Sequence, residues 1–548
     1  MRSSPNRLAV LAVLVFGVHL TAQAPQETID RIVAEGRGAS QVMRHLDHLV
    51  NKIGPRLTSS TNLTTACEWA VETFKSFGIE NAHMEEWGEF PVGFDRGVMM
   101  GRMVAPKDMI LDITTMAWSP GTKGLSRGRV VLAPEDAASL DAEKVKGAWV
   151  LVAQQQRRGA GGNNDLSAAL EKAGALGELR PGFGATNDLV ITAGNSRVSW
   201  DELPTFPRIT LRRDQITEIR ELMDQQQEVV LEFDIENRFV EGPIKLYNVI
   251  ADIKGTEFPD EYVIVGGHID SWDGARGTTD NGTGVATTLE AARLLTASGA
   301  RPRRSIRFML WSGEEQGLLG SKAWIAKNAD MLPKISAVLV HDGGTNYVSG
   351  IISTLAMADD FKAVFAPCQA LDPTNFPFEI RVQPGLPSGI GSDHDSFLQS
   401  GVPGFFWNQA GRANYTHTHH TQFDTFDAAI PEYQQHTSMI VAIGALGVAD
   451  LDHMLSRENL KAATTRFRRR IGLSLDEDNK VSSVVEDGIA GRAGMKVGDK
   501  LLVVGTKEIK SLADLREALN VKETKVKFAY EREGKRLEGE FVFPAEDQ

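Results

Sequence analysis

Residues 262–270 read YVIVGGHID, and this stretch joins an apolar, strand-like run to His268 and Asp270. Similar apolar runs alternate with helical patterns from Asn248 to about Leu455. Such alternation is typical of a mostly parallel sheet flanked by helices, so we predict an α/β fold. The predicted strands cover residues 262–265, 306–311, 335–340 and 402–407, and the predicted helices cover residues 285–297, 318–327 and 431–451.

Acidic side chains follow two more strands of this predicted sheet. Glu314 and Glu315 come after residues 306–311, and Asp342 comes after residues 335–340. In open α/β sheets, ligands bind beyond the carboxyl ends of the strands. We therefore expect these three carboxylates to meet His268 and Asp270 at one edge of the sheet.

The spacing within this set suggests separate roles. Side chains two positions apart on an extended backbone share a side, so Asp270 can hold the His268 imidazole in one tautomer. Asp280 follows a glycine-rich turn, where its carboxylate could bridge two cations or cap a helix. Adjacent Glu314 and Glu315 point in different directions, so one can bind metal while the other moves a proton; a solvated turn is the alternative.

Three histidines, His417, His419 and His420, stand close together in the stretch HTHHTQFDT at residues 417–425. At most one of them is needed as a metal ligand, because surface histidine clusters also bind metals adventitiously. Imidazole and carboxylate ligands together suit zinc, and cobalt or manganese accept similar sets.

These motifs resemble, in order and spacing, those of the di-zinc aminopeptidase and glutamate carboxypeptidase family of zinc exopeptidases (peptidase clan MH). The segments that carry the resemblance are HID (268–270), DNGTG (280–284), GEEQG (313–317), Asp342 and HTQFDT (420–425). The resemblance implies the zinc-exopeptidase fold, exopeptidase activity and peptide substrates.

The same resemblance implies two zinc ions and a role for each ligand. One ion would be held by His268, Asp280 and Asp342, and the second by Asp280, Glu315 and His420. Glu314 would be the general base that activates a metal-bound water, and Asp270 would orient His268. His417 and His419 would lie at the rim.

The substrate-binding residues are less sharply indicated. Asp393 and His394, in the segment GSDHDSF at residues 391–397, resemble a family segment that lines the substrate pocket. His394 could stabilise an oxyanion or could be hydrogen-bonded within a loop. Arg276 and Arg412 are candidates for binding a terminal carboxylate, since carboxypeptidases must neutralise that charge; both could equally be solvated.

The direction of cleavage stays open at this point. We expect an aminopeptidase first, with a carboxypeptidase or dipeptidase as the alternative, because GPRLTSS at residues 54–60 resembles the branch that contains carboxypeptidase Q. An alternative from another class is a peptide-binding protein built on an inactive peptidase scaffold.

The chain divides into several predicted parts. Residues 1–24 have the layout of a secretory signal, which predicts a secreted or periplasmic protein without a later membrane span. Residues 25–110 and 236–458 would form the peptidase domain. Short β-type runs between them, at residues 111–235, resemble an inserted β-rich protease-associated domain.

Residues 467–545 resemble a PDZ domain. In that case backbone amides near Ile471, Gly472 and Leu473 would hold the carboxylate of a peptide C-terminus.

The composition argues against nucleic acid as a partner and leaves the pairing of the two cysteines undecided. The net charge of −13 argues against nucleic acid, which attracts clustered lysine and arginine. The two cysteines, Cys67 and Cys368, could form one disulfide or remain two buried thiols.

Overall fold

The computed structural model describes residues 24–152, 162–182, 186–461, 471–475, 479–485, 488–509, 514–515, 518–519 and 523–543. The predicted signal therefore lies outside the described residues, apart from Ala24. The chain divides into two compact units, Met1–Leu460 and Lys461–Gln548. After the domains predicted from the sequence, we call them the peptidase unit and the PDZ unit, and we describe each by itself.

The peptidase unit is built around a mixed sheet whose strands run in the order β14-β11-β9-β10-β8 before continuing into a lobe. Four of these strands are β14 (Gly404–Phe406), β11 (Ile335–Val340), β9 (Phe258–His268) and β10 (Arg304–Trp311). They are parallel to one another, as predicted, whereas β10 pairs antiparallel with β8 (Val230–Ile253). The prediction of a mostly parallel sheet thus holds only for this part.

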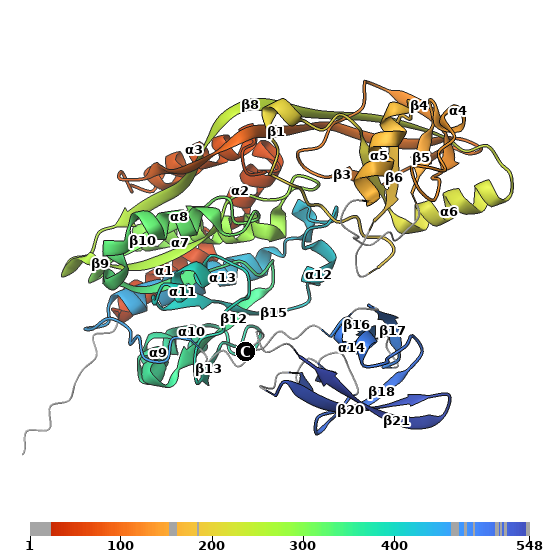
Figure 1. The fold of residues 1–548 in the computed structure, drawn as a ribbon. Helices are drawn as coiled ribbons and strands as arrows, with labels where there is room; N and C mark the ends of the chain where they lie inside the picture. The colour runs from red at the N-terminus through yellow and green to blue at the C-terminus, as the bar shows by residue number, and fades with distance from the viewer. Residues whose placement is uncertain are drawn as a thin grey trace, which may run out of the picture. The chain divides into compact units, whose positions relative to one another are not determined.

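Helices cover both faces of the parallel strands (Figure 1). One face carries α7 (Thr283–Ala297) and α13 (Pro431–Ala449), with α1 (Gln26–Gly38), α2 (Val42–Asp47) and α3 (Thr61–Ser76) in the same layer. The other face carries α8 (Leu319–Lys327) and α11 (His394–Gln399), where Trp324 and Phe397 pack on Met309 and Val338. From Met439 to Ala449 the α13 sequence is apolar on all sides, as expected for a helix that is buried all round.

Two long strands lead from this sheet into the lobe. β1 (His83–Ala105) pairs antiparallel with β8 over almost its whole length, and Figure 1 shows both strands running out together. The lobe continues the sheet with β4 (Ser126–Leu132), β5 (Trp149–Leu151), β6 (Gly177–Pro181), β7 (Arg208–Leu211) and β3 (Ile113–Thr115). It also contains α4 (Ala142–Val145), α5 (Gly162–Lys172) and α6 (Arg213–Asp224). The segment predicted as β-rich is therefore an α/β lobe.

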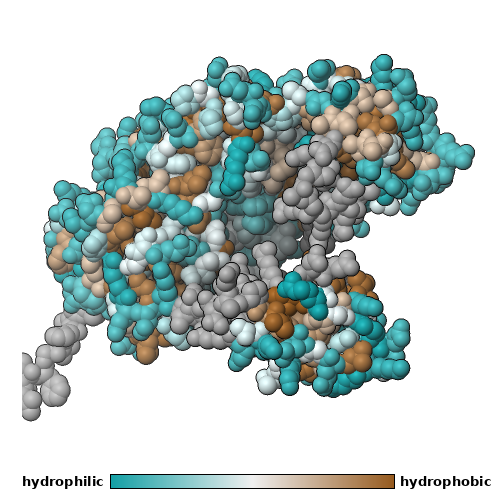
Figure 2. All heavy atoms as spheres, in the orientation of Figure 1, coloured by the Kyte–Doolittle hydropathy of each residue, from teal (hydrophilic) through white to brown (hydrophobic). Residues whose placement is uncertain are grey.

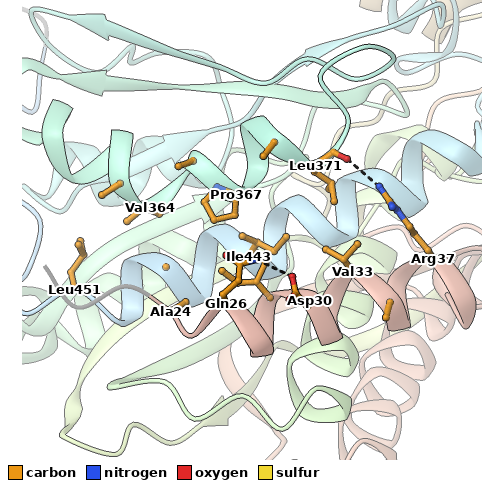
Figure 3. A pocket seen from close by; sticks show the side chains of 16 residues that line it. Ala24, Gln26, Asp30, Val33, Arg37, Val364, Pro367, Leu371, Ile443 and Leu451 are labelled. Atoms are coloured by element: carbon orange, nitrogen blue, oxygen red, sulfur yellow. Dashed lines mark hydrogen bonds between the residues drawn. The ribbon is translucent and has the colours of Figure 1, made fainter. Parts of the chain in front are cut away.

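A groove of about 720 Å³ lies in the helical layer. Figure 3 shows Val33 of α1, Ile443 of α13 and Pro367 of α10 (Ala366–Leu371) lining it, with Arg37 donating to the Leu371 carbonyl. None of the predicted site residues lines this groove. It is separate from the carboxyl ends of the strands.

The remaining elements of the peptidase unit complete its edges. They are β2 (Met109–Ile110), β12 (Tyr347–Thr354), α9 (Ala358–Val364), β13 (Glu379–Gln383), β15 (Asn408–Ala410) and α12 (Tyr415–Thr418).

Cys67 and Cys368 are both buried free thiols, so the alternative of a disulfide is wrong. No helix among the described residues is long and apolar enough to cross a bilayer. The face drawn in Figure 2 is mostly hydrophilic, with scattered hydrophobic residues.

The PDZ unit is a small, mainly antiparallel β domain. Its elements are β16 (Leu473–Leu475), β17 (Val481–Val484), α14 (Ile489–Arg492), β18 (Lys500–Val504), β19 (Lys507–Glu508), β20 (Lys525–Arg532) and β21 (Lys535–Val542). Phe528 and Phe541 stack at 4.0 Å in a core of its own. A separate core is what an independently folding domain requires.

Candidate metal centre

The carboxyl ends of β9, β10 and β11 bring the predicted ligands together. His268 is the last residue of β9, and Asp342 follows β11 by two positions. The His268 Nε2 atom lies 3.2 Å from an Asp342 carboxylate oxygen and 3.2 Å from Asp280 Oδ1. These contacts form because parallel strands end at the same edge of the sheet.

Asp280 lies between the two histidines of the site. Its Oδ1 faces His268, while its Oδ2 lies 2.9 Å from His420 Nε2. Asp280 and Asn281 have non-helical backbone angles, and α7 begins only at Thr283 with Gly282 as its N-cap. The alternative reading of Asp280 as a helix cap is therefore wrong.

Two glutamates lie beside this pair of histidines in different directions. Glu315 Oε2 is 3.0 Å from His420 Nε2, whereas Glu314 Oε2 approaches His268 Nε2 only to 4.0 Å. Burial, and secondly the Asp280 carboxylate, raises the pKa of Glu315 to about 7. Burial is also the main reason why the pKa of Glu314 is raised well above its usual value.

Asp270 contacts both His268 and the turn that carries the glutamates. His268 Nδ1 lies 3.0 Å from the Asp270 carbonyl oxygen and 3.5 Å from its carboxylate. The carboxylate accepts the backbone amides of Glu314 and Glu315 at 3.3 and 3.4 Å, and the Thr58 hydroxyl at 2.8 Å. Asp270 thus holds His268 through its backbone carbonyl, while its buried carboxylate holds the turn that carries both glutamates.

The three clustered histidines are placed differently. His420 has a left-handed backbone with φ 55° and turns its ring toward Asp280 and Glu315. His419 stacks on it at 3.9 Å, and its half-exposed ring lines the cleft 3.6 Å from Asp280 Oδ2, close enough to offer a further ligand atom. His417 stacks on Phe423 instead.

The donor set fits metal cations. Asp280 Oδ2 and Glu315 Oε1 are buried without a hydrogen-bond partner. The groups His268, Asp280 and Glu315, and Asp280, His419 and His420, each bring their ligand atoms within 4.8 Å of one another. Burial alone would lower the pKa of His268, but the Asp342 and Glu314 carboxylates raise it well above its usual value. Bound cations would relieve this crowding of negative charge.

Two further residues hold the site from behind, and sequence reasoning assigned neither of them a role. Asp424 accepts the backbone amides of Thr279 at 2.6 Å and Asp280 at 3.2 Å, which fixes the backbone that carries the Asp280 carboxylate. Arg56 is 0% exposed and donates to the carbonyls of Ile269 and Gly277 at 2.8 Å. Burial lowers the pKa of Arg56 to about 10. The sequence feature that could have indicated a role for Arg56 is its place in the GPRLTSS segment at residues 54–60.

A cleft of about 1010 Å³ opens over the site. Its lining includes Asp280, Glu314, Glu315, Asp342, His419, His420, Gly391, Ser392, Gln409 and Tyr415. The lining also includes Lys322 of α8, which is the only lysine or arginine at this cleft within the part of the chain that the structure describes. Its ammonium donates to the Gly317 carbonyl at 2.8 Å, which leaves further N–H donors free for a ligand.

The predicted substrate-binding residues lie outside the lining of this cleft. Asp393 and His394 are 0% exposed. Arg412 pairs with Glu432 at 2.7 Å and lies over the Tyr433 ring, and Arg276 is an exposed residue of the loop before Asp280. No direct contact with substrate follows from these positions.

In the PDZ unit, the predicted carboxylate-binding loop is well held. Gly472 has a φ of 77°, and its carbonyl accepts the Val485 amide at 2.7 Å. The Ile471 carbonyl accepts the Ala490 amide at 2.7 Å. Leu473 then starts β16, which pairs with β17 on one side within the described residues.

Known proteins share both units. Residues 248–443 match the model of peptidase family M28, and residues 480–532 match a PDZ domain. Carboxypeptidase Q of Mus musculus is 27% identical over 437 residues, which cover 79% of this chain and 90% of that protein. Carboxypeptidase Q of Homo sapiens is 25% identical over 440 residues, with the same shares of both chains.

A solved structure shares the fold. The peptidase M28 precursor from Shewanella amazonensis superposes with a TM-score of 0.58 at 23% identity, covering 79% of this chain and 98% of that one. The predicted fold class of the peptidase part is confirmed, as is the PDZ domain. The resemblance of the lobe to a protease-associated domain stays a prediction.

Proposed function

Since this chain carries a peptidase family M28 domain and is a zinc-dependent exopeptidase, we propose that it removes residues from the carboxyl end of peptides. This reverses the order expected from sequence, where the aminopeptidase came first. The observation that carries the proposal is Lys322, which among the described residues is the only lysine or arginine that lines the cleft over the predicted metal site.

We propose two zinc ions in this site. His268, Asp280 and Asp342 would hold one, and Asp280, Glu315 and His420 the other, because Asp280 presents one oxygen to each histidine. Bound zinc ions would lower the pKa of a coordinated water and polarise the scissile carbonyl. Cobalt and manganese suit the same ligands.

Glu314 is the proposed general base. It lines the cleft beside the ligands, yet its carboxylate stays 4.0 Å from the nearest histidine nitrogen, which leaves it available to a water molecule. It would take the proton of the attacking water and pass it to the leaving amine. Asp270 would act through His268 and through the amides of the glutamate turn.

The charge of the cleft supports cleavage at the carboxyl end. A terminal carboxylate needs a cation, and Lys322 supplies one on the wall formed by α8. A terminal amine needs a carboxylate, but the carboxylates among the described residues of the lining are Asp280, Glu314, Glu315 and Asp342 alone. Those four are already used by the proposed metals and the proton transfer.

The test compares peptides blocked at one end. We expect the zinc-loaded protein to cleave N-acetylated peptides and to leave C-terminally amidated ones intact. Lys322→Ala should lower kcat/KM for free C-termini about 10- to 100-fold, the worth of one charge-assisted hydrogen bond. Lys327→Ala is the matched control, since Lys327 lies on the same helix but pairs with Glu85 at 2.7 Å. Cleavage of amidated peptides but not acetylated ones would instead establish an aminopeptidase.

The PDZ unit and the lobe have proposed roles as well. A peptide C-terminus can add to the edge of β16 that pairs with no strand among the described residues, with its carboxylate at the amides near Ile471, Gly472 and Leu473. The lobe at residues 111–235 would serve as a protease-associated domain that shapes the cleft. Export to the periplasm or the medium remains our proposal from the leader sequence.

A further inference from the structure

A short segment of the lobe binds the loop that carries His420. Ile191 and Thr421 form an antiparallel bridge. On either side of it, the Thr192 amide donates to the His420 carbonyl at 2.8 Å, and the Gln422 amide donates to the Val190 carbonyl at 3.2 Å. The lobe therefore contacts the backbone of a proposed metal ligand directly.

The Gln422 side chain adds two hydrogen bonds to this contact. Its Oε1 accepts the Val190 amide at 2.8 Å, and its Nε2 donates to the Asp188 carbonyl at 2.6 Å. One side-chain amide thus satisfies a donor and an acceptor of the same lobe segment. We call residues 188–192 together with residues 420–422 the lobe clamp.

The two histidine ligands differ in how they are held. His268 ends a central strand and its side chain is 1% exposed, so the sheet fixes it. His420 lies in a loop, with a 31% exposed side chain and a left-handed backbone that non-glycine residues seldom adopt. Thr192 lines a small cavity together with His420, Glu315 and Asp280, which brings the lobe to the edge of the site.

We propose that the lobe positions His420 through this clamp, with Gln422 as the positioning residue. Zinc held by Asp280, Glu315 and His420 then depends on the lobe, whereas zinc held by His268, Asp280 and Asp342 does not. The inference rests on the proposed two-metal function. Residues behind a ligand commonly change metal affinity about 10- to 100-fold when removed, because they preset its orientation.

The experiment measures zinc binding rather than turnover. The full-length protein and its Gln422→Ala variant are equilibrated with zinc buffered by a calibrated chelator, and bound zinc is counted by mass spectrometry. We expect two ions in the wild type. In the variant, one ion should require about 10- to 100-fold more free zinc, and the other should bind unchanged.

Two more variants sharpen the test. Gln422→Glu keeps an acceptor for the Val190 amide but cannot donate to Asp188, so its affinity should fall between the other two. Gln435→Ala is the matched control, because Gln435 also donates its amide to backbone carbonyls, those of Gly36 and Arg37, away from the metal site. It should bind both ions normally.

Each contrary result has a distinct meaning. Unchanged zinc binding in Gln422→Ala, or an equal weakening of both ions, would overturn the proposed role of the clamp. A wild type that binds a single ion would defeat the two-metal proposal instead. If the wild type binds one ion, the proposed role of the clamp is supported when Gln422→Ala weakens the binding of that ion and is overturned when it does not.

Discussion

Asp280 of the peptidase unit and Asp499 of the PDZ unit are both nearly buried, at 5% and 1% exposure. Arg532 donates to Asp499 twice, at 2.6 and 2.7 Å, and the Lys496 amide adds a bond at 2.7 Å. Asp280 has two histidines, three further carboxylates nearby and one oxygen without a hydrogen bond. The arrangement around Asp499 is complete as it stands, whereas the arrangement around Asp280 would be completed by the proposed zinc.

This comparison distinguishes Asp499, whose hydrogen bonds stabilise a fold, from the carboxylates around Asp280, whose arrangement suits catalysis. Burial would raise the pKa of Asp499, but the Arg532 and Lys496 bonds lower it overall. Burial raises the pKa of Glu314 and Glu315, and neighbouring carboxylates add to the effect. Groups whose pKa values are shifted in this way by crowding and burial are typical of functional sites.

The largest expected effect tests the chemical side of this comparison. Glu314→Gln should lower kcat about 10²- to 10⁴-fold, because the amide cannot accept the proton of the attacking water. Zinc content should stay at the wild-type level, since Glu314 is not a proposed ligand. Steady-state kinetics and zinc counting on the same preparation check both points. Normal turnover in this variant would remove Glu314 from the role of base.

A smaller effect tests the structural side. Asp499→Asn should destabilise the PDZ unit by about 1–3 kcal/mol, because the bonds to Arg532 lose their charge. Hydrogen exchange resolved over residues 480–532 measures this in the full chain. Hydrolysis of a dipeptide and zinc content should not change. A loss of zinc in this variant would contradict the assignment of the two carboxylates to separate tasks.

The smallest effect is the pH dependence of the same unit. The pKa of Asp499 is lowered on folding, so its contribution is fully present above the unfolded value of about 3.9 and is lost as pH falls through the folded value. We expect PDZ stability to fall below about pH 4, and Asp499→Asn to remove part of that slope. Equal slopes in wild type and variant would show that other groups cause the loss.

Sequence order predicted the parallel strands and the residues that follow them. The strand at Ile335–Val340 lies at the predicted positions, and His268, Glu315 and Asp342 meet as expected, because strand ends determine where such residues gather. The local periodicity of a strand and its terminal residue carry this information.

Contacts between distant segments could not be predicted in this way. The clamp joins Val190 to Gln422, more than 200 positions apart, and neither segment has a periodic pattern. Lys322 lies on a helix whose position was predicted, but its place in the cleft depends on packing around that helix. Arg412 had the right chemistry for a carboxylate, but it pairs with Glu432 instead.

The paired strands β1 and β8 also define where the lobe could be replaced by another domain. Met103 lies opposite Leu231 in the register, so the chain leaves for the lobe and returns from it on adjacent strands. Neighbouring strands are about 5 Å apart, which suits joining a foreign insert at both ends without a linker. A lobe from another protein could thus be grafted as a cassette between residues 103 and 231. If the proposed clamp positions His420, a donor lobe must also supply a segment that reaches the His420 loop.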